Sequence, residues 1–184
     1  MIFRATPLPG ATLVELDPHE DRRGLFARSF CEREFAAHGL ATRYPQANLS
    51  WNRSQGTLRG MHWQAAPRGE AKLVRCTAGA IYDVIVDLRR SSPTRLRWFA
   101  VELSARNRIS LYVPEGFAHG FLTLADESEV SYLMSASHAP EAARGLRFDD
   151  PRLGIAWPTP PAEISERDLG HPGFDESLLY GDPP

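Results

Sequence analysis

The sequence predicts an all-β protein built as an antiparallel sandwich or barrel. Short apolar and β-branched runs recur roughly every 8–12 residues from Tyr44 onward, separated by Gly, Pro, Asn or Ser. Only residues 31–38 (CEREFAAH) resemble a short helix, and Gly39 follows them where a helix commonly ends. The length of 184 residues suits one domain with a substantial core, so we expect a single domain over residues 1–184.

The expected strands can be placed in order along the chain. Residues 11–17 (ATLVELD) alternate weakly between apolar and polar side chains, and a polar turn ending at Gly24 leads to a second strand at 25–30. Further strands are predicted at 43–48, 57–64, 70–77, 80–88, 96–103, 108–113, 117–124 and 129–135. The proline-rich tail beyond Asp149 is expected to wrap around the outside of the sheets.

Composition and charge argue against several classes of protein. The chain is 42% hydrophobic and 24% charged, and its formal net charge of -2 gives no general attraction for nucleic acid or anionic membranes. No apolar run approaches the roughly 20 residues that span a bilayer, and the N-terminus lacks the pattern of a secretory signal. Cys31 and Cys76 match no metal or redox spacing, so we expect reduced thiols in a cytoplasmic protein.

Lys72 stands out because it is the only lysine among 21 basic residues, the other 20 being arginines. The imbalance suggests that this position needs a compact, titratable ammonium rather than a guanidinium. The competing interpretation is a surface lysine that survived by chance. Alternation places Lys72 on the same face of its strand as Val74 and Cys76, and a lysine that points inward is costly to bury unless it is paired.

His62 lies in the preceding strand between two bulky apolar neighbours. Alternation predicts that it shares a face with Leu58 and Gly60, and that Arg59 takes the opposite face. A hydrogen-bonded core histidine is the competing interpretation. Because His62 and Lys72 are both costly to bury and lie on adjacent strands, together they indicate a cavity.

Four segments, LRGMHWQ, KLVRC, YDVIVDLR and VPEGFAHGF, occur in an order and spacing that resemble the dTDP-4-dehydrorhamnose 3,5-epimerase family. The similarity extends from about residue 3 to about residue 168, nearly the whole chain. It implies a jelly-roll barrel of the cupin type, usually a homodimer. It also implies proton exchange, without a metal or another cofactor, at carbons beside the 4-keto group of a nucleotide-linked hexose.

The resemblance implies four catalytic residues. His62 matches the family's base, and an ordinary histidine pKa of about 6.5 suits this task. Asp168 matches the aspartate that polarises the base, although Ser165 with an acid three residues later also resembles a helix capping box. Lys72 matches a lysine that can stabilise an enolate oxygen. Tyr132 matches the acid that returns a proton from the opposite face, since a phenol stays protonated until needed.

Substrate-binding residues are implied in the same way. Arg23 and Arg59 match the family's phosphate contacts, for which guanidinium forks are well suited, and Arg167 is a further candidate. Gln46 and Asn48 match residues that meet the base and sugar end of the nucleotide.

Three more positions belong to this implied site. Phe26 is a candidate to line the nucleotide end. His119 and Asp83 match positions inside the barrel, and the resemblance leaves open whether they contact the substrate or support residues that do.

The chain departs from the family pattern at several positions, which are Arg28, Ala47, Ala143 and His138. The first three stand where the family usually has an acid, and they leave the nucleotide base undetermined. His138, which is expected to face the substrate, stands where the family has a second tyrosine. It leaves undetermined whether one carbon or both are epimerised.

Two other functions remain open from the sequence. A metal-dependent cupin isomerase or dioxygenase needs several His and carboxylate ligands facing one cavity, often beginning with His-x-His, whereas Trp63 and Gln64 follow His62. A barrel that binds a sugar nucleotide without catalysis would not need the four catalytic candidates together.

Overall fold

Fourteen strands and two short helices make up the computed structural model, which describes residues 1–181. The elements are β1 (Ile2–Ala5), β2 (Thr12–Glu15), β3 (His19–Asp21), β4 (Gly24–Phe26), α1 (Glu32–Ala37), β5 (Gln46–Asn52), β6 (Thr57–Gln64), β7 (Lys72–Ala78), β8 (Ala80–Asp87), β9 (Trp98–Ser104), β10 (Ser110–Val113), β11 (Phe117–Thr123), β12 (Ser128–Met134), β13 (Ala143–Gly145), β14 (Glu163–Ile164) and α2 (Glu166–Leu169), followed by a 3₁₀ turn (Glu176–Leu178).

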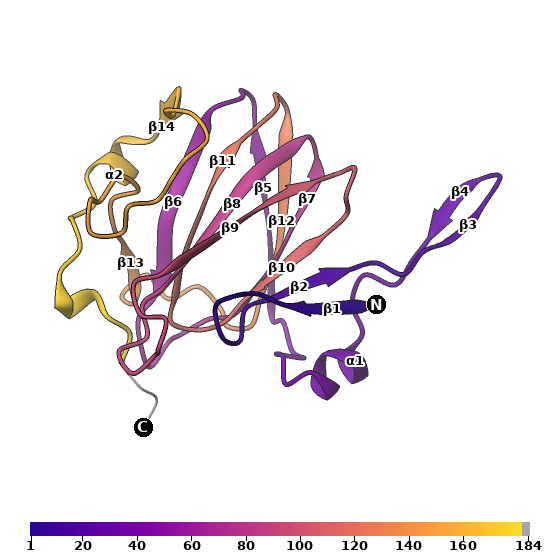
Figure 1. Cartoon of the computed structure of the whole chain (residues 1–184), viewed down its shortest axis with the longest axis horizontal. Helices are drawn as coiled ribbons and strands as arrows, with labels where there is room; N and C mark the ends of the chain where they lie inside the picture. The colour runs from indigo at the N-terminus through magenta and orange to yellow at the C-terminus, as the bar shows by residue number, and fades with distance from the viewer. Residues whose placement is uncertain (182–184) are drawn as a thin grey trace.

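The strands form two sheets that face each other as the layers of a jelly-roll barrel (Figure 1). One sheet has the order β1-β2-β10-β7-β12-β5, and the other has the order β13-β6-β11-β8-β9 with β14 beside β6. Pairing within both sheets is antiparallel except for β14, which runs parallel to β6. The predicted fold class is therefore confirmed.

Most predicted strands are found, but some of their bounds differ and several very short elements were not predicted. The strand predicted at 57–64 is β6 with the same bounds, whereas the one predicted at 43–48 is shifted to β5. The strand predicted at 25–30 ends at Phe26, because it is the second arm of a short hairpin, β3–β4. The elements β1, β3, β13, β14 and α2 were not predicted, and β3 lies where a polar turn was expected. All of them are only two to four residues long, too short to show a hydrophobic period of their own.

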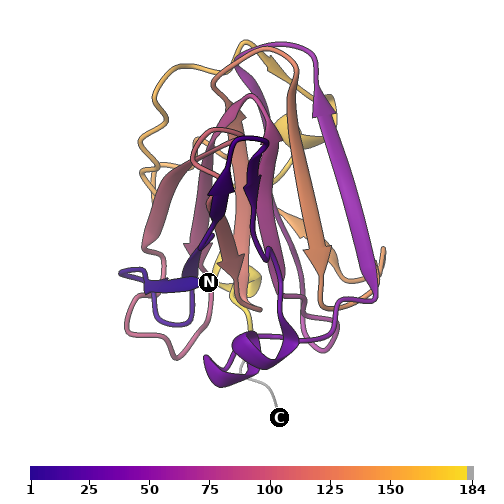
Figure 2. The same ribbon diagram turned by 90° about the vertical axis from the view of Figure 1, so that its right-hand side faces the viewer.

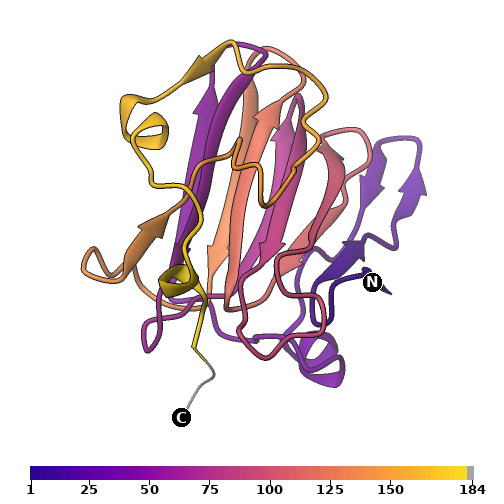
Figure 3. The ribbon, with the colours of Figure 1, turned by 60° about the vertical axis from the view of Figure 1, so that its left-hand side comes forward.

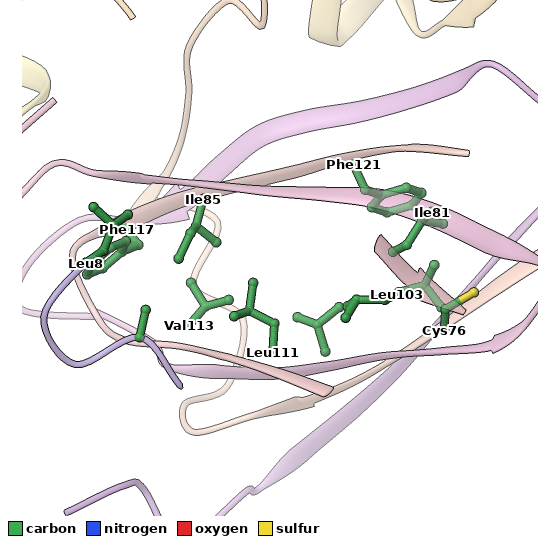
Figure 4. Close-up of a cluster of buried hydrophobic side chains, with 12 residues drawn as sticks. Leu8, Cys76, Ile81, Ile85, Leu103, Leu111, Val113, Phe117 and Phe121 are labelled. Carbon is green, nitrogen blue, oxygen red and sulfur yellow. The ribbon is translucent and has the colours of Figure 1, made fainter. Parts of the chain in front are cut away.

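The core between the sheets is apolar and contributed by both layers (Figure 4). Cys76 and Leu111 from one sheet pack with Ile81, Ile85 and Phe117 from the other, and each is at most 2% exposed. Burying side chains of this size contributes roughly 1.5–3 kcal/mol each. Val74 and Cys76 both belong to this cluster, which confirms the prediction that they share the inward face of β7.

The outer face of each sheet is covered by a terminal segment. The chain beyond Asp149 crosses the outside of β6, β11 and β8, as predicted, where Phe174 packs in one cluster with Met61 and Trp63 (Figure 3). Helix α1 lies at one end of the barrel and brings Phe35 into a cluster on the outside of the other sheet (Figures 1 and 2). No helix among the described residues is long and apolar enough to cross a membrane.

A bulge in β6 changes which side chains face the interior. His62 pairs with His119, and Arg59 pairs with Phe121. The two pairs are therefore three residues apart along β6 but only two residues apart along β11, so β6 holds one extra residue. The extra residue reverses the alternation, and Arg59 and His62 line the same cavity. The prediction that Arg59 takes the face opposite His62 is therefore wrong. Gly60 permits the bulge, with φ of +127° and no room for a side chain against β11.

We predict that Gly60→Ala destabilises the fold by about 2–4 kcal/mol, since it combines backbone strain with a steric clash. A Cβ atom at Gly60 would lie 2.6 Å from the Cα of Gly120. Gly24 is a matched control, because its φ is +123° but nothing lies within 4 Å of its Cβ position. Urea unfolding should show a clearly smaller loss for Gly24→Ala. Equal losses would mean that the close approach of β6 and β11 contributes nothing.

Candidate active site

A cavity of about 480 Å³ opens between the two sheets, within the range of small-molecule sites. Both sheets and helix α2 contribute to its lining. The residues that were predicted from the sequence and line it are Asn48, Arg59, His62, Lys72, His119, Tyr132, His138, Arg167 and Asp168.

His62 and Asp168 form a hydrogen-bonded pair on one wall of this cavity. The Nε2 atom of His62 lies 2.8 Å from Oδ1 of Asp168, although the two residues are 106 positions apart in sequence. The second carboxylate oxygen of Asp168 accepts the backbone N–H of Gly60 at 3.1 Å. Burial alone would raise the pKa of Asp168, but these hydrogen bonds hold it below its ordinary value. An ionised Asp168 therefore accepts the Nε2–H of His62, which leaves Nδ1 with a lone pair for proton transfer.

Helix α2 positions Asp168, and both sequence interpretations of this residue apply. The Oγ of Ser165 caps the helix by accepting the backbone N–H of Asp168 at 3.1 Å. The Asp168 side chain does not return to the cap, as a full capping box would require, but points to His62. The Ser165 cap thus orients the helix, and the Asp168 carboxylate is free to form its hydrogen bond with His62.

Lys72 enters the cavity from the opposite sheet. Strands β6 and β7 belong to different sheets, so the prediction that His62 and Lys72 lie on adjacent strands is wrong, and the two residues face each other across the cavity. The Nζ atom of Lys72 lies 3.3 Å from a carboxylate oxygen of Glu70 and donates to the backbone oxygen of His62 at 3.3 Å. Lys72 is only 6% exposed, and a paired carboxylate offsets the cost of burying its charge.

Tyr132 lies on β12, in the same sheet as Lys72 and opposite His62. Burial, and after it the negative charge of Asp83, raise the pKa of the Tyr132 phenol well above its ordinary value. The ring meets the imidazole of His119 edge-on at 6.0 Å between centroids. His119 in turn is hydrogen-bonded through Nε2 to the fully buried Asp83 at 2.8 Å. Asp83 does not line the cavity; it lies behind His119 and holds that ring.

Hydrogen bonds hold several polar and charged side chains around the cavity. Arg59 is held by a hydrogen bond from its Nε to Oδ1 of Asn52, at 2.7 Å. Gln46 does not line the cavity but donates to the side chain of Asn48 at 3.0 Å and accepts the backbone N–H of His138 at 2.9 Å. It therefore orders two lining residues.

Two predicted substrate contacts lie away from the cavity within one chain. Arg23 and Phe26 belong to the β3–β4 hairpin, which projects from the barrel in Figure 1. Arg23 pairs with Asp21, and Phe26 is 78% exposed. Arg28, which replaces a family acid, is paired with Glu34 of helix α1 at 2.8 Å.

Two residues near the site were not identified from sequence. Glu70 lies two positions before Lys72, a spacing that would have suggested a shared face. The Nε2 atom of His171 lies 3.5 Å from Oδ1 of Asp168, three residues away, and a helix beginning at the Ser165 cap would have brought these positions together. Burial, followed by the charge on His62, lowers the pKa of His171.

Comparison with known proteins agrees with this geometry. The family description dTDP-4-dehydrorhamnose 3,5-epimerase matches residues 5–176. The enzyme of that name from Methanothermobacter thermautotrophicus is 41% identical over 181 residues, covering 97% of each chain. The crystal structure of the Elizabethkingia anophelis enzyme superposes with a TM-score of 0.93 at 38% identity, covering 98% of this chain and 99% of the other.

A third relative carries a ligand. The structure of dTDP-6-deoxy-D-glucose-3,5-epimerase from Legionella pneumophila, in complex with dTDP-4-keto-L-rhamnose, has a TM-score of 0.91 at 31% identity and covers 100% of this chain and 99% of the other. These relatives lend no support to a metal-dependent cupin or a non-catalytic barrel. The family resemblance in the sequence is confirmed: this chain belongs to the dTDP-4-dehydrorhamnose 3,5-epimerase family.

Proposed function

We propose that this protein is an isomerase that epimerises a nucleotide-linked 4-keto-6-deoxyhexose by proton exchange at C3, C5 or both. The observation that carries the proposal is the His62–Asp168 pair facing Tyr132 across one cavity, with the ammonium of Lys72 between the sheets. The relative from Legionella was solved with a dTDP-linked 4-keto sugar, which supports the same substrate class for this chain.

The proposed reaction needs a base and an acid on opposite sides of the sugar. Nδ1 of His62 takes the proton from the carbon beside the keto group, the C–H pair becomes the enolate C=C bond, and negative charge moves to the keto oxygen. Lys72 stabilises that oxygen. The phenol O–H of Tyr132 then protonates the same carbon from the other face, which inverts its configuration. Solvent exchange restores both side chains.

The charge pattern around the cavity suits a diphosphate. The whole chain carries a formal net charge of -2, so attraction for an anion must come from local cations. Arg59 and Arg167 line the cavity and are assigned here to the diphosphate, and Asn48 to the nucleoside. His138 and Ala143 also line it, and in this proposal they determine which carbon and which base are accepted.

We further propose that the active form is a cytoplasmic homodimer of single-domain chains. The β3–β4 hairpin projects with Phe26 exposed, and the edge strand β5 exposes Leu49 and Trp51 at 63% and 49%. Exposed apolar groups beside an unpaired edge favour association. A partner's hairpin would bring Arg23 and Phe26 to the cavity. The free thiols of both cysteines support a reducing compartment.

Deuterium exchange tests the proposed activity. We expect the purified protein, incubated in deuterated solvent with a dTDP-linked 4-keto-6-deoxyhexose, to incorporate deuterium at carbons beside the keto group. Mass spectrometry counts one deuteron for a single epimerase and two for a double one. GDP-, CDP- and UDP-linked analogues determine the preferred base. Absence of exchange with all four would refute the proposal.

His62→Ala and Tyr132→Phe should each reduce this exchange by about a hundred- to ten-thousand-fold, because each removes a general acid or base. Nucleotide affinity, measured by calorimetry, should stay nearly unchanged. Arg59→Ala is the complementary variant and should weaken binding first. A near-normal rate for His62→Ala would require a different base.

Lys72→Arg should reduce exchange on the order of a hundred- to a thousand-fold at saturating substrate, although it keeps the charge. The forked guanidinium is larger than an ammonium, and Nζ of Lys72 is held at 3.3 Å by both Glu70 and the backbone oxygen of His62. Arg106→Lys, the reverse substitution at an exposed turn, is the control, and its rate of deuterium exchange should match that of wild type. If Lys72→Arg stayed within about threefold of wild type, the assigned role in stabilising the enolate would be wrong.

Complementation between inactive variants tests the shared site. Arg23→Ala and His62→Ala should each be impaired alone, whereas co-expression should restore about a quarter of the wild-type activity, because half of the random dimers hold one intact site. Light scattering should give the mass of a dimer. A fully active monomer would contradict this arrangement.

A further inference from the structure

The imidazole of His171 fills a space that Gly145 leaves beside the catalytic pair. Gly145 on β13 pairs with His62 on β6, and a Cβ atom at Gly145 would overlap the His171 ring. The His62 and His171 rings meet edge-on at 5.5 Å between centroids. A second histidine thus lies beside the catalytic pair, and the proposed reaction does not use it.

Three ligand atoms converge at this point. Oδ1 of Asp168 lies 2.8 Å from Nε2 of His62 and 3.5 Å from Nε2 of His171, and ligand atoms of the three residues all lie within 4.8 Å of one another. Nε2 of His171 is buried, and its one recorded contact among the described residues is the long ion-pair distance of 3.5 Å to Oδ1 of Asp168, with no well-formed hydrogen bond. A buried nitrogen of this kind normally has a partner, and a metal ion would supply one.

The spacing fits a small transition-metal ion. Zinc bonds to nitrogen and oxygen of about 2.0–2.1 Å imply distances between ligand atoms of about 3.0 Å at a right angle and about 3.4 Å in a tetrahedron. The two separations from Oδ1 of Asp168, 2.8 and 3.5 Å, lie close to these values. The ligand nitrogens of the two histidines lie within 4.8 Å of each other and would approach further to bind one ion. Two imidazoles and one carboxylate favour Zn²⁺ or a similar ion over Mg²⁺, which prefers oxygen ligands.

We propose that His62, Asp168 and His171 form a zinc-binding site and that bound zinc inhibits the epimerase. The metal would need the lone pair on Nε2 of His62, so a neutral ring would carry its proton on Nδ1. That nitrogen could then no longer accept a proton from the sugar. The inhibitory part rests on the proposed function; the binding part does not.

Calorimetry with chelator-treated protein tests the site without reference to catalysis. We expect one Zn²⁺ per chain for wild type, at least about tenfold weaker binding for His171→Asn, and no heat with Mg²⁺. His38→Asn is the matched control, because His38 stacks on Phe3 outside the cavity, and it should bind zinc like wild type. Gly145→Ala, which displaces the His171 ring, provides a second route to the same loss. Zinc binding that survives both substitutions, or no binding by wild type, would overturn the site.

The rate of deuterium exchange tests inhibition. Each variant is compared with itself in chelator and in zinc, so any change in its basal rate cancels. Zinc should abolish most exchange by wild type and by His38→Asn but not by His171→Asn. Wild type that binds zinc at this site yet exchanges normally would overturn inhibition. If no exchange occurs even in chelator, the proposed function fails, and calorimetry still decides the metal site.

Discussion

The carboxylate of Asp168 is the contact on which the rest of the site depends. One of its oxygens accepts the backbone N–H of Gly60 and the other accepts the imidazole of His62. A single buried charge therefore ties the C-terminal segment to the bulge in β6 and orients the imidazole of His62. Such a charge is costly to bury unless its lone pairs are satisfied, so the bulge, the base and helix α2 depend on one another.

The barrel divides its interior into an apolar part and a polar part. Side chains such as Leu111 and Ile85 close the core, whereas the cavity holds charges that occur in pairs. Lys72 is matched by Glu70, and His119 by Asp83. Because these two buried groups have partners, their desolvation is offset while they stay within reach of a ligand. The apolar part contributes most of the stability, and the paired groups give the cavity its chemistry.

The two sheets each carry half of the proposed chemistry. His62 and Arg59 come from one sheet, and Lys72 and Tyr132 from the other. A planar intermediate between the sheets would present one face to the imidazole and the other to the phenol, which is what inversion requires. His171 lies beside His62 on this side, and the carboxylate that orients His62 also belongs to the proposed set of metal ligands.

The sequence by itself determined the strand pattern, the family and nine of the 19 residues that line the cavity, because period-two alternation and short motifs are local properties. It identified Lys72 through composition and His62 through its motif. Only the tertiary structure decided that Arg59 shares a face with His62, because a bulge reverses alternation without any change in local pattern. It also decided that the chain near Asp168 returns to β6, which brings His171 beside the base. These contacts join residues more than 100 positions apart. They form because a buried carboxylate needs hydrogen-bond donors, and those donors come from a distant part of the chain that a local sequence pattern cannot identify.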